Sequence, residues 1–415
     1  MERGAKLFRK IVSRSLLVLL MVSTLATSPR IQHVKADVST PTLIPVPFHY
    51  QEKDYYCGPA ALEMVFNYYG EDISQYEIAC VARTIGDPLF TTYTDELRRA
   101  AQFSNISTSM GDELLNNITG YTLRQLGYAA IEASGLDLTT LRNFLDQGKP
   151  LILLMWQDST HTYGHYRVAT GYNETCVFLD DPWNKPLWGG MYGGPNVAIN
   201  DSQFLDLWSY SGDWALYVSP WTVDLSTPAY VEPGVPFHIE VSVTYPQPLL
   251  NAFPPSPYPA SSCNASINLP TDLSLTDREA QTKTLGTGFL QVGNSSSTSW
   301  TLVANSSVRG TVSIIVEGQI SGSVDAAGDY TAYNYMDRIG ARVNVSVDIS
   351  VGAPIPGDVN HDGKVNLQDL VTLALAYGSK PGDTNWNPNA DIDGNGVVDR
   401  ADLAILAQHY GQHYP

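Results

Sequence analysis

The chain has 415 residues, of which 43% are hydrophobic and 10% aromatic, so it is too long for one ordinary core and can fill two or three packed domains. Its formal net charge of −18 argues against nucleic acid or an anionic membrane surface as a partner. Four cysteines in this length exclude a small disulfide-stabilised scaffold.

Residues 1–36 are predicted to be a secretory signal peptide. Five basic residues precede an apolar run, Leu16 to Leu25, that is short for a bilayer span, and a small-residue cleavage site ends at Ala36. An uncleaved anchor is the alternative. Cleavage leaves 17 Lys and Arg against 41 Asp and Glu, a net charge of −24. We therefore expect a secreted, extracellular protein with no membrane span in the mature chain, either free or associated with the cell surface.

A cysteine precedes the first strong helical pattern. Apolar residues recur at three- and four-residue intervals over 58–69, which predicts an amphipathic helix. Pro59 suits its first turn and Gly70 its end. Cys57 is therefore expected at a helix N-terminus, where free N–H groups and the helix dipole favour a thiolate.

Two interpretations of Cys57 remain open at this point. A cysteine in an exported chain is commonly a buried thiol or one half of a disulfide. A bridge between Cys80 and Cys176 would instead leave Cys57 free to act as a nucleophile.

The pattern over 44–221 predicts an α+β domain. Helical spacing at 94–103 and around 136–147 is followed by short apolar or alternating runs that are bounded by turn residues. The predicted strands are 151–156, 165–172, 176–180 and 214–218, with a hairpin connection at 171–175 and a short helix at 202–208. Helices followed by an antiparallel sheet are typical of the α+β class.

Three polar residues complete a candidate catalytic set with Cys57. A thiolate nucleophile needs a base, a group that orients this base, and donors for the oxyanion. His165 begins a predicted strand, and pairing with the next strand would bring Asp181 beside it. Gln51 lies six residues before Cys57 and carries an amide that can donate to an oxyanion. Taken singly, each residue also has an ordinary structural explanation, as a strand-edge histidine, a turn-forming aspartate or a surface glutamine.

Neighbouring residues compete for two of these roles. His49 lies in the run leading to Gln51 and His161 in a polar loop, so neither has a strand to hold it as a base. Asp180 directly precedes Asp181 and leaves the identity of the orienting carboxylate ambiguous.

Five motifs appear in this order along the chain: Val46-Pro47-Phe48-His49-Tyr50-Gln51, Tyr56-Cys57-Gly58-Pro59-Ala60-Ala61, Gly148-Lys149-Pro150, Gly164-His165-Tyr166 and Asp180-Asp181-Pro182-Trp183. With them, residues 44–220 resemble the bacteriocin-processing (double-glycine leader) cysteine peptidases, family C thirty-nine. The resemblance implies a papain-like fold. It also implies that Cys57 is the nucleophile, His165 the general base and then acid, Asp181 the residue that orients it, and Gln51 the oxyanion donor. No transporter domain follows, so processing of a peptide during export is not expected.

Residues 222–353 are predicted to form an all-β, immunoglobulin-like sandwich. Charged residues become sparse, and strand-like alternation appears at 237–243, 311–316 and 342–347. The proline-rich insert 245–258 is expected to be a long loop. Nothing in this region suggests catalysis, so a spacer or binding module is expected.

A loop–helix unit is repeated after a proline-containing linker at 352–356. Loops that begin at Asp358 and Asp391 place oxygen side chains at positions 1, 3, 5, 9 and 12 and glycine at position 6, which is the pattern that calcium requires. The predicted ligands of two calcium ions are Asp358, Asn360, Asp362, Lys364, Asn366 and Asp369 in one loop, and Asp391, Asp393, Asn395, Val397, Asp399 and Asp402 in the other; Lys364 and Val397 would contribute backbone carbonyls. The alternative is a pair of Asx-rich turns that cap two helices.

Residues 357–413 resemble a type I dockerin, a small all-α calcium-binding module, because two loop–helix units carry Asp at position 12 of each loop. The resemblance implies docking to a cohesin module of a scaffold or cell-surface protein. The partner-contacting positions are Leu367 and Gln368 in one unit and Arg400 and Ala401 in the other, and they differ from the Ser-Thr type frequent in the family.

The sequence as a whole predicts a multidomain secreted cysteine peptidase that acts on a peptide or protein and is tethered through its dockerin. Calcium is the only cofactor expected, and catalysis needs none. One alternative is a non-catalytic papain-like binding or adhesion protein. Another is a dockerin-bearing accessory subunit of a polysaccharide-degrading complex, although no pair of carboxylates typical of a glycosidase supports it.

Overall fold

The computed structural model of the protein describes residues 41–413 apart from 87–88, 90, 111–120, 122–126, 229–230, 232, 248–258, 277, 305–308, 321–335, 339, 351–354 and 361. The predicted signal peptide and most of the proline-rich insert lie outside the described residues.

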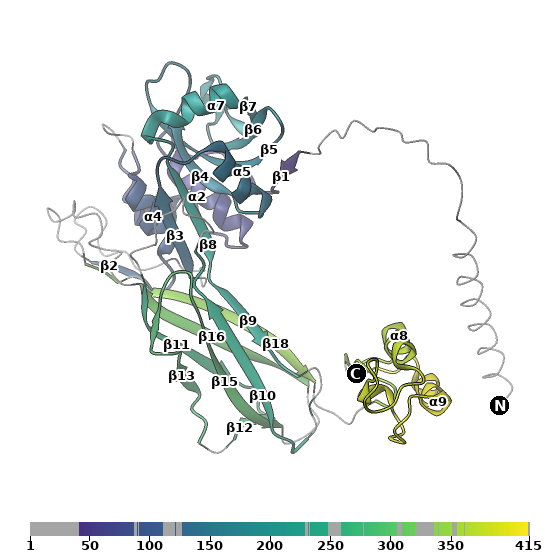
Figure 1. Cartoon of the computed structure of the whole chain (residues 1–415). Helices are drawn as coiled ribbons and strands as arrows, with labels where there is room; N and C mark the ends of the chain where they lie inside the picture. Colours follow the sequence, from purple (N-terminus) through teal and green to yellow (C-terminus); the bar gives the residue numbers. More distant parts are fainter. Residues whose placement is uncertain are drawn as a thin grey trace, which may run out of the picture. The chain divides into compact units, whose positions relative to one another are not determined.

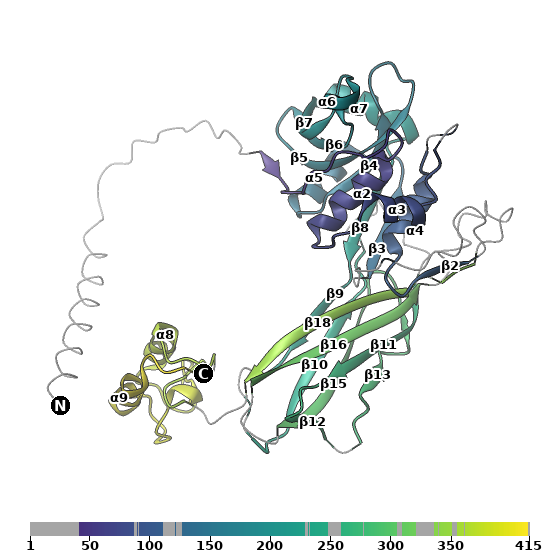
Figure 2. The same ribbon diagram turned by 180° about the vertical axis from the view of Figure 1, so that it is seen from behind.

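Helix α2 (Cys57–Tyr68) lies against the sheet of the N-terminal region in both views (Figures 1 and 2). Its residues Leu62, Val65 and Phe66 are fully buried, because the three- and four-residue spacing places them on one face. The helix ends before Gly70, whose φ of 87° is a conformation that glycine adopts without strain. The helix predicted at 58–69 is confirmed.

A seven-stranded antiparallel sheet fills the rest of this region, in the order β3–β8–β4–β5–β6–β7 with β1 paired to β5. Its strands are β1 (Thr42–Leu43), β3 (Tyr128–Ala133), β4 (Leu151–Trp156), β5 (Gly164–Tyr172), β6 (Cys176–Asp181), β7 (Gly194–Asn200) and β8 (Ala215–Pro220). The other helices are α3 (Gln75–Val81), α4 (Thr94–Gln102), α5 (Leu138–Asp146), α6 (Lys185–Trp188), α7 (Asp201–Trp208) and the 3₁₀ turn η1 (Ser209–Ser211).

The predicted strands and helices of this region are confirmed within a few residues, but the sequence pattern missed β1, β3, β7, α3 and α6. Strand β3 is buried on both faces for most of its length, so its sequence shows no alternation of apolar and polar residues. Strand β7 begins with Gly194 and Pro195, which are typical of turns.

The middle region consists of two antiparallel sheets that lie face to face (Figures 1 and 2). One contains β9 (Thr222–Ser226), β10 (Phe237–Thr244), β12 (Leu273–Leu275) and β15 (Ser295–Ala304). The other contains β11 (Ala260–Asn268), β13 (Thr282–Thr284), β14 (Phe289–Leu290), β16 (Arg309–Ile320) and β18 (Gly340–Ser350). A separate ribbon pairs β2 (Thr108–Met110) with β17 (Met336–Arg338). Every second side chain of β10 is buried, as the predicted alternation requires.

The C-terminal region has a small core of its own. Helices α8 (Leu367–Ala376) and α9 (Arg400–His409), with the 3₁₀ turn η3 (Pro388–Ala390), bury Val359, Val365, Leu373 and Leu406. The chain is therefore multidomain, with an α+β region, a β-rich middle region and a small helical module.

Two further findings bear on the sequence analysis. All four cysteines are free, so the Cys80–Cys176 bridge is not formed and Cys57 is not half of a disulfide. Among the residues that the structure describes, no helix is both long and apolar enough to cross a membrane.

Replacement of Phe66 by alanine should lower the stability of the α+β region by about 3–5 kcal/mol, because the ring is fully buried against Tyr121 and Tyr128. Urea unfolding followed by tryptophan fluorescence measures the loss. Tyr163→Ala is the control, since that side chain is 68% exposed and its removal should change little. Equal effects of the two substitutions would contradict this assignment of the core.

Candidate active site

Strands β5 and β6 bring a histidine and a carboxylate together. Val168 pairs with Asp180, so Asp181 lies beside the first residues of β5, where His165 is located. The distance from His165 Nε2 to Asp181 Oδ1 is 2.8 Å. His165 is 3% exposed and Asp181 is fully buried, so water does not weaken the contact.

The thiol of Cys57 lies at the other side of this histidine. Cys57 is the first residue of α2, and its thiol lies close enough to His165 for the two groups to shift each other's pKa. Because Nε2 faces Asp181, the ring nitrogen that remains for the thiol is Nδ1. The structure therefore brings together three of the four residues that the sequence suggested for catalysis, in the order thiol, imidazole and carboxylate.

The electrostatics of the group favour an ionised thiol. Burial opposes ionisation, but the hydrogen bond and charge of His165 outweigh it and lower the pKa of Cys57. Burial likewise opposes the charged form of His165, yet the carboxylate of Asp181 raises the pKa of the imidazole. Burial would raise the pKa of Asp181, but the positive charges of Arg167 and His165 hold it well below its usual range. A thiolate–imidazolium pair is the state that these shifts stabilise together.

Arg167 is a charged residue of this group that the sequence analysis missed. Its Nε donates to Asp181 Oδ2 over 2.7 Å, and the side chain is 1% exposed. A signal was present in the sequence, because residues two apart in a strand face the same side and Arg167 follows His165 by two.

Gln51 is buried near the segment that follows Asp181. Its backbone N donates to Pro182 O over 2.8 Å, and its side-chain Nε2 donates to Lys53 O over 2.8 Å. Gln51 Oε1 is buried and has no hydrogen-bond partner among the described residues. One amide N–H of Gln51 is thus occupied, and the second is left for a ligand, so its oxyanion role stays a prediction.

The two other histidines and the second aspartate that the sequence offered for these roles contact residues other than Cys57 and His165. His49 Nε2 lies 2.7 Å from Asn67 Oδ1, and His161 stacks on Trp156 with its Nε2 3.0 Å from Asp206. Asp180 accepts a hydrogen bond from the backbone N of Asn196, and burial raises its pKa to about 6. Asp181, not Asp180, is the carboxylate that contacts the histidine.

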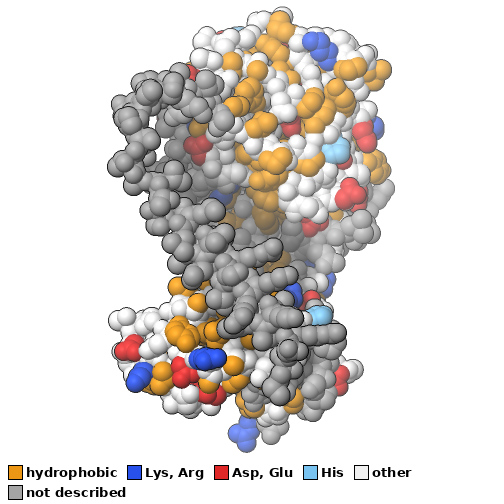
Figure 3. Space-filling view, turned by 90° about the vertical axis from the view of Figure 1, so that its right-hand side faces the viewer, with side chains coloured by type: hydrophobic (Ala, Val, Ile, Leu, Met, Phe, Trp, Pro, Cys, Tyr) orange, Lys and Arg blue, Asp and Glu red, His pale blue; other side chains and the backbone are white. Residues whose placement is uncertain are grey.

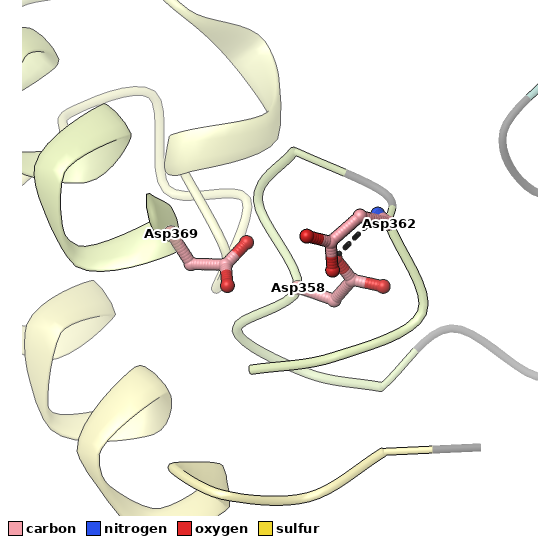
Figure 4. A group of neighbouring side chains, drawn as sticks. All are labelled: Asp358, Asp362 and Asp369. Carbon is pink, nitrogen blue, oxygen red and sulfur yellow. Dashed lines mark hydrogen bonds between the residues drawn. The ribbon is translucent and has the colours of Figure 1, made fainter. Parts of the chain in front are cut away.

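Two acidic clusters occupy the C-terminal loops. One oxygen from each of Asp358, Asp362 and Asp369 lies within 4.8 Å of the others (Figure 4). Asp391, Asp393 and Asp402 form the matching cluster. Clustered carboxylates repel one another unless a cation lies between them, and calcium prefers such oxygens. The donor set therefore fits calcium.

The other predicted ligands make contacts within their loops. Asn366 and Asp399 are the N-caps of α8 and α9, where each accepts a backbone hydrogen bond two residues on. Asn360 donates to Asp362, and Asn395 donates to Asp393. The backbone N–H groups of Lys364 and Val397 donate to the side chains two residues before them. The capping predicted by the alternative view of these loops is present, and it coexists with the acidic clusters.

Two protein-family models match the chain. Residues 43–213 match the model described as Peptidase_C39 like family, and residues 356–409 match the Dockerin type I domain. The chain combines a C39-like peptidase domain with a type I dockerin. Both resemblances inferred from the sequence motifs are thereby confirmed.

Comparison with individual proteins gives partial matches. The chain is 32% identical over 103 residues to the cellulosomal-scaffolding proteins B and A of Acetivibrio thermocellus, which is 22% of this chain but only 13% and 6% of those relatives. The peptidase domain of Streptococcus ComA, a bi-functional ABC transporter, is 19% identical, and the match covers 42% of this chain and 98% of that one with a TM-score of 0.29.

The reactivity of Cys57 should extend to lower pH than that of an ordinary thiol. A lowered thiol pKa means that thiolate forms earlier as the pH rises, and a raised imidazole pKa means that the ion pair survives beyond the usual range of histidine. Alkylation by iodoacetamide as a function of pH measures this. In His165→Ala the midpoint should rise to at least about 8.5, the value of a free thiol, because burial by itself raises the pKa of Cys57. An unchanged midpoint would show that His165 does not act on the thiol.

Proposed function

We propose that the protein is an exported cysteine peptidase that hydrolyses peptide bonds and is held in an extracellular complex by its dockerin. The observation that carries the proposal is the buried contact of 2.8 Å between His165 and Asp181, with the thiol of Cys57 close enough to the same ring for each to shift the other's pKa. Membership of residues 43–213 in a peptidase-like family supports the reaction class.

The reaction begins with attack of the Cys57 thiolate on a peptide carbonyl. Asp181 accepts from Nε2–H, so Nδ1 is the atom that takes the thiol proton and gives it to the leaving amine. Water then attacks the acyl-enzyme while His165 acts as base, which restores the thiol. Every proton transfer in this scheme uses Nδ1 of His165, because Nε2 is hydrogen-bonded to the Asp181 carboxylate.

The start of α2 is suited to the oxyanion of the tetrahedral intermediate. The first N–H groups of a helix have no acceptor within the helix, and they carry partial positive charge. Gln51 is proposed to add the second N–H of its side-chain amide as a donor. Gly58, the next residue after Cys57, lets Thr92 and Tyr166 pack closely against this turn, because a Cβ there would lie 3.1 Å from Thr92 and 3.3 Å from Tyr166.

The surroundings of His165 suit an uncharged peptide segment. The Trp183 ring lies edge-on to His165 with centroids 6.2 Å apart, and Trp188 packs on Trp183. Leu187 between them in sequence is 68% exposed. Figure 3 shows hydrophobic side chains across one face of the body at the top of the view, with isolated charged side chains between them. Around His165 itself, the Trp183, Trp188 and Leu187 side chains favour apolar side chains of a peptide over a polyanion.

The remaining regions are proposed to export the peptidase domain and to attach it to a scaffold protein. Residues 1–36 would direct export, residues 222–353 would form an immunoglobulin-like spacer, and residues 357–413 would bind calcium and dock to a cohesin-type module. The similarity to cellulosomal-scaffolding proteins supports a cell-surface complex as the location. The domain boundaries, including 44–221 for the peptidase, belong to this proposal.

Cys57→Ala should abolish peptide hydrolysis, because no other group of the site can form the acyl-enzyme. The measurement is cleavage of a peptide library under reducing conditions, together with labelling by a biotinylated iodoacetamide. His165→Ala should slow labelling at neutral pH by at least about tenfold, as loss of an activating base implies. Cys176→Ala is the matched control, since it removes a free, partly buried thiol outside the site.

A wild-type protein that leaves the library uncut, and whose Cys57 labels no faster than Cys176, would contradict the peptidase function. It would favour the non-catalytic binding protein that the sequence left as an alternative.

Asp362→Ala combined with Asp393→Ala should abolish calcium binding by the full chain, because each substitution removes a carboxylate from one cluster. Isothermal titration calorimetry measures binding, and calcium at 100 times Kd should stabilise the wild-type module by about 2.7 kcal/mol for each site. Asp383→Ala, an exposed acidic residue of the same module, is the control. Retained calcium binding in the double variant would refute the assignment.

A further inference from the structure

Arg167 contacts the side of Asp181 that His165 leaves free. Asp181 Oδ1 accepts from His165 Nε2 at 2.8 Å and from the backbone N of Trp183 at 3.0 Å, whereas Oδ2 accepts from Arg167 Nε at 2.7 Å. The carboxylate therefore has a donor on each oxygen, and its rotation about the Cβ–Cγ bond is fixed. A carboxylate with His165 as its one side-chain partner could rotate between two equivalent positions.

We propose that Arg167 is a positioning residue of the candidate active site, which fixes the Asp181 carboxylate toward His165 and neutralises part of its charge. The inference rests on the proposed peptidase function and deepens it. Arg167 does not contact the thiol in any described interaction, so it acts on Cys57 through the position of Asp181 and His165 and through the electric field of its own charge.

The strand geometry explains how Arg167 reaches this position. His165 and Arg167 are two residues apart in β5, so their side chains leave the same face of the strand. Val168 pairs with Asp180, which places Asp181 directly across from Arg167 and diagonal to His165. One aspartate can therefore meet both side chains without a break in the sheet.

The guanidinium group is held at all three of its nitrogens. Besides Nε on Asp181, Nη1 donates to Trp156 O over 3.0 Å and Nη2 donates to Gln157 O over 2.7 Å. The ring of Tyr192 lies over the group, 5.5 Å from its central carbon. Arginine remains charged throughout the working pH range. Arg167 thus supplies a positive charge whose position is constrained by β4, β6 and Tyr192.

The fixed positive charge beside Asp181 should lower the pH at which both the Cys57 thiol and the His165 imidazolium lose their protons. The charged and titratable groups that face the pair are His165, Cys57, Tyr192 and Asp158. The cation makes the carboxylate a weaker attractor for the imidazolium proton, and it also favours thiolate over thiol. Removal of the cation should therefore move both ionisations of the Cys57–His165 pair to higher pH.

A purely structural role for Arg167 predicts a different result. The bonds to Trp156 O and Gln157 O hold the end of β4, and their loss would lower stability. It would not displace the pH at which the thiol and imidazole ionise. The pH profile of Cys57 separates the two roles.

The test is the rate of alkylation of Cys57 by iodoacetamide across pH, measured on the full chain in a Cys80→Ala, Cys176→Ala background. In Arg167→Gln both inflections should move up by about one pH unit. Arg167→Lys restores the charge and should bring both inflections back to the wild-type positions. Arg142→Gln is the matched control, because Arg142 pairs with Asp201 at 2.8 Å in the same domain but makes no described contact with His165.

Circular dichroism and thermal unfolding report whether each variant is folded. If Arg167→Gln alone does not fold, the comparison is made between Asp181→Asn and Asp181→Asn with Arg167→Gln, where the second protein lacks both buried charges. The inflections of the double variant should lie at higher pH than those of Asp181→Asn.

Superimposable profiles for Arg167→Gln and wild type, or for the two variants in the Asp181→Asn background, would overturn the positioning role and leave the peptidase function intact. A wild-type profile with the single inflection of an ordinary thiol, together with an uncut peptide library, would overturn the peptidase function itself.

Discussion

The buried negative charge of Asp181 is the constraint on which the rest of the site depends. A carboxylate without solvent contact is unstable unless opposite charges and hydrogen bonds replace its water. Here His165, Arg167 and the backbone N of Trp183 supply them. Because these groups come from β5 and from the segment after β6, the charge also fixes how the hairpin and the following chain are arranged.

The position of Cys57 depends on the same arrangement through α2. The helix is buried along one face against the sheet, so its first residue lies beside the strand that carries His165. The Gln51 segment before the helix is tied to Pro182 by a backbone hydrogen bond. Thiol, imidazole and carboxylate therefore belong to one rigid core, which is the condition for holding reactive groups within hydrogen-bond reach.

The C-terminal module also contains buried carboxylates, but their negative charge is balanced differently from that of Asp181. Asp369 and Asp402 are fully buried, and each accepts backbone N–H groups of its own loop. Among the described residues, none of the six clustered carboxylates forms a salt bridge with Lys or Arg, whereas Asp181 is paired with Arg167. A bound cation would be the natural counter-charge for such a loop, and the proposed calcium sites would then link the folding of the module to calcium.

The sequence by itself determined the elements and motifs whose signal is local. Helical spacing identified α2, turn residues delimited β4 to β6, and the repeated ligand spacing marked the two C-terminal loops. It also suggested Cys57, His165 and Asp181 as a group. Only the tertiary structure decided that Asp181 rather than Asp180 meets His165, that all cysteines are free and that Arg167 completes the group. These outcomes depend on strand register and on which charges share a buried space, and both are set by contacts between residues distant in sequence.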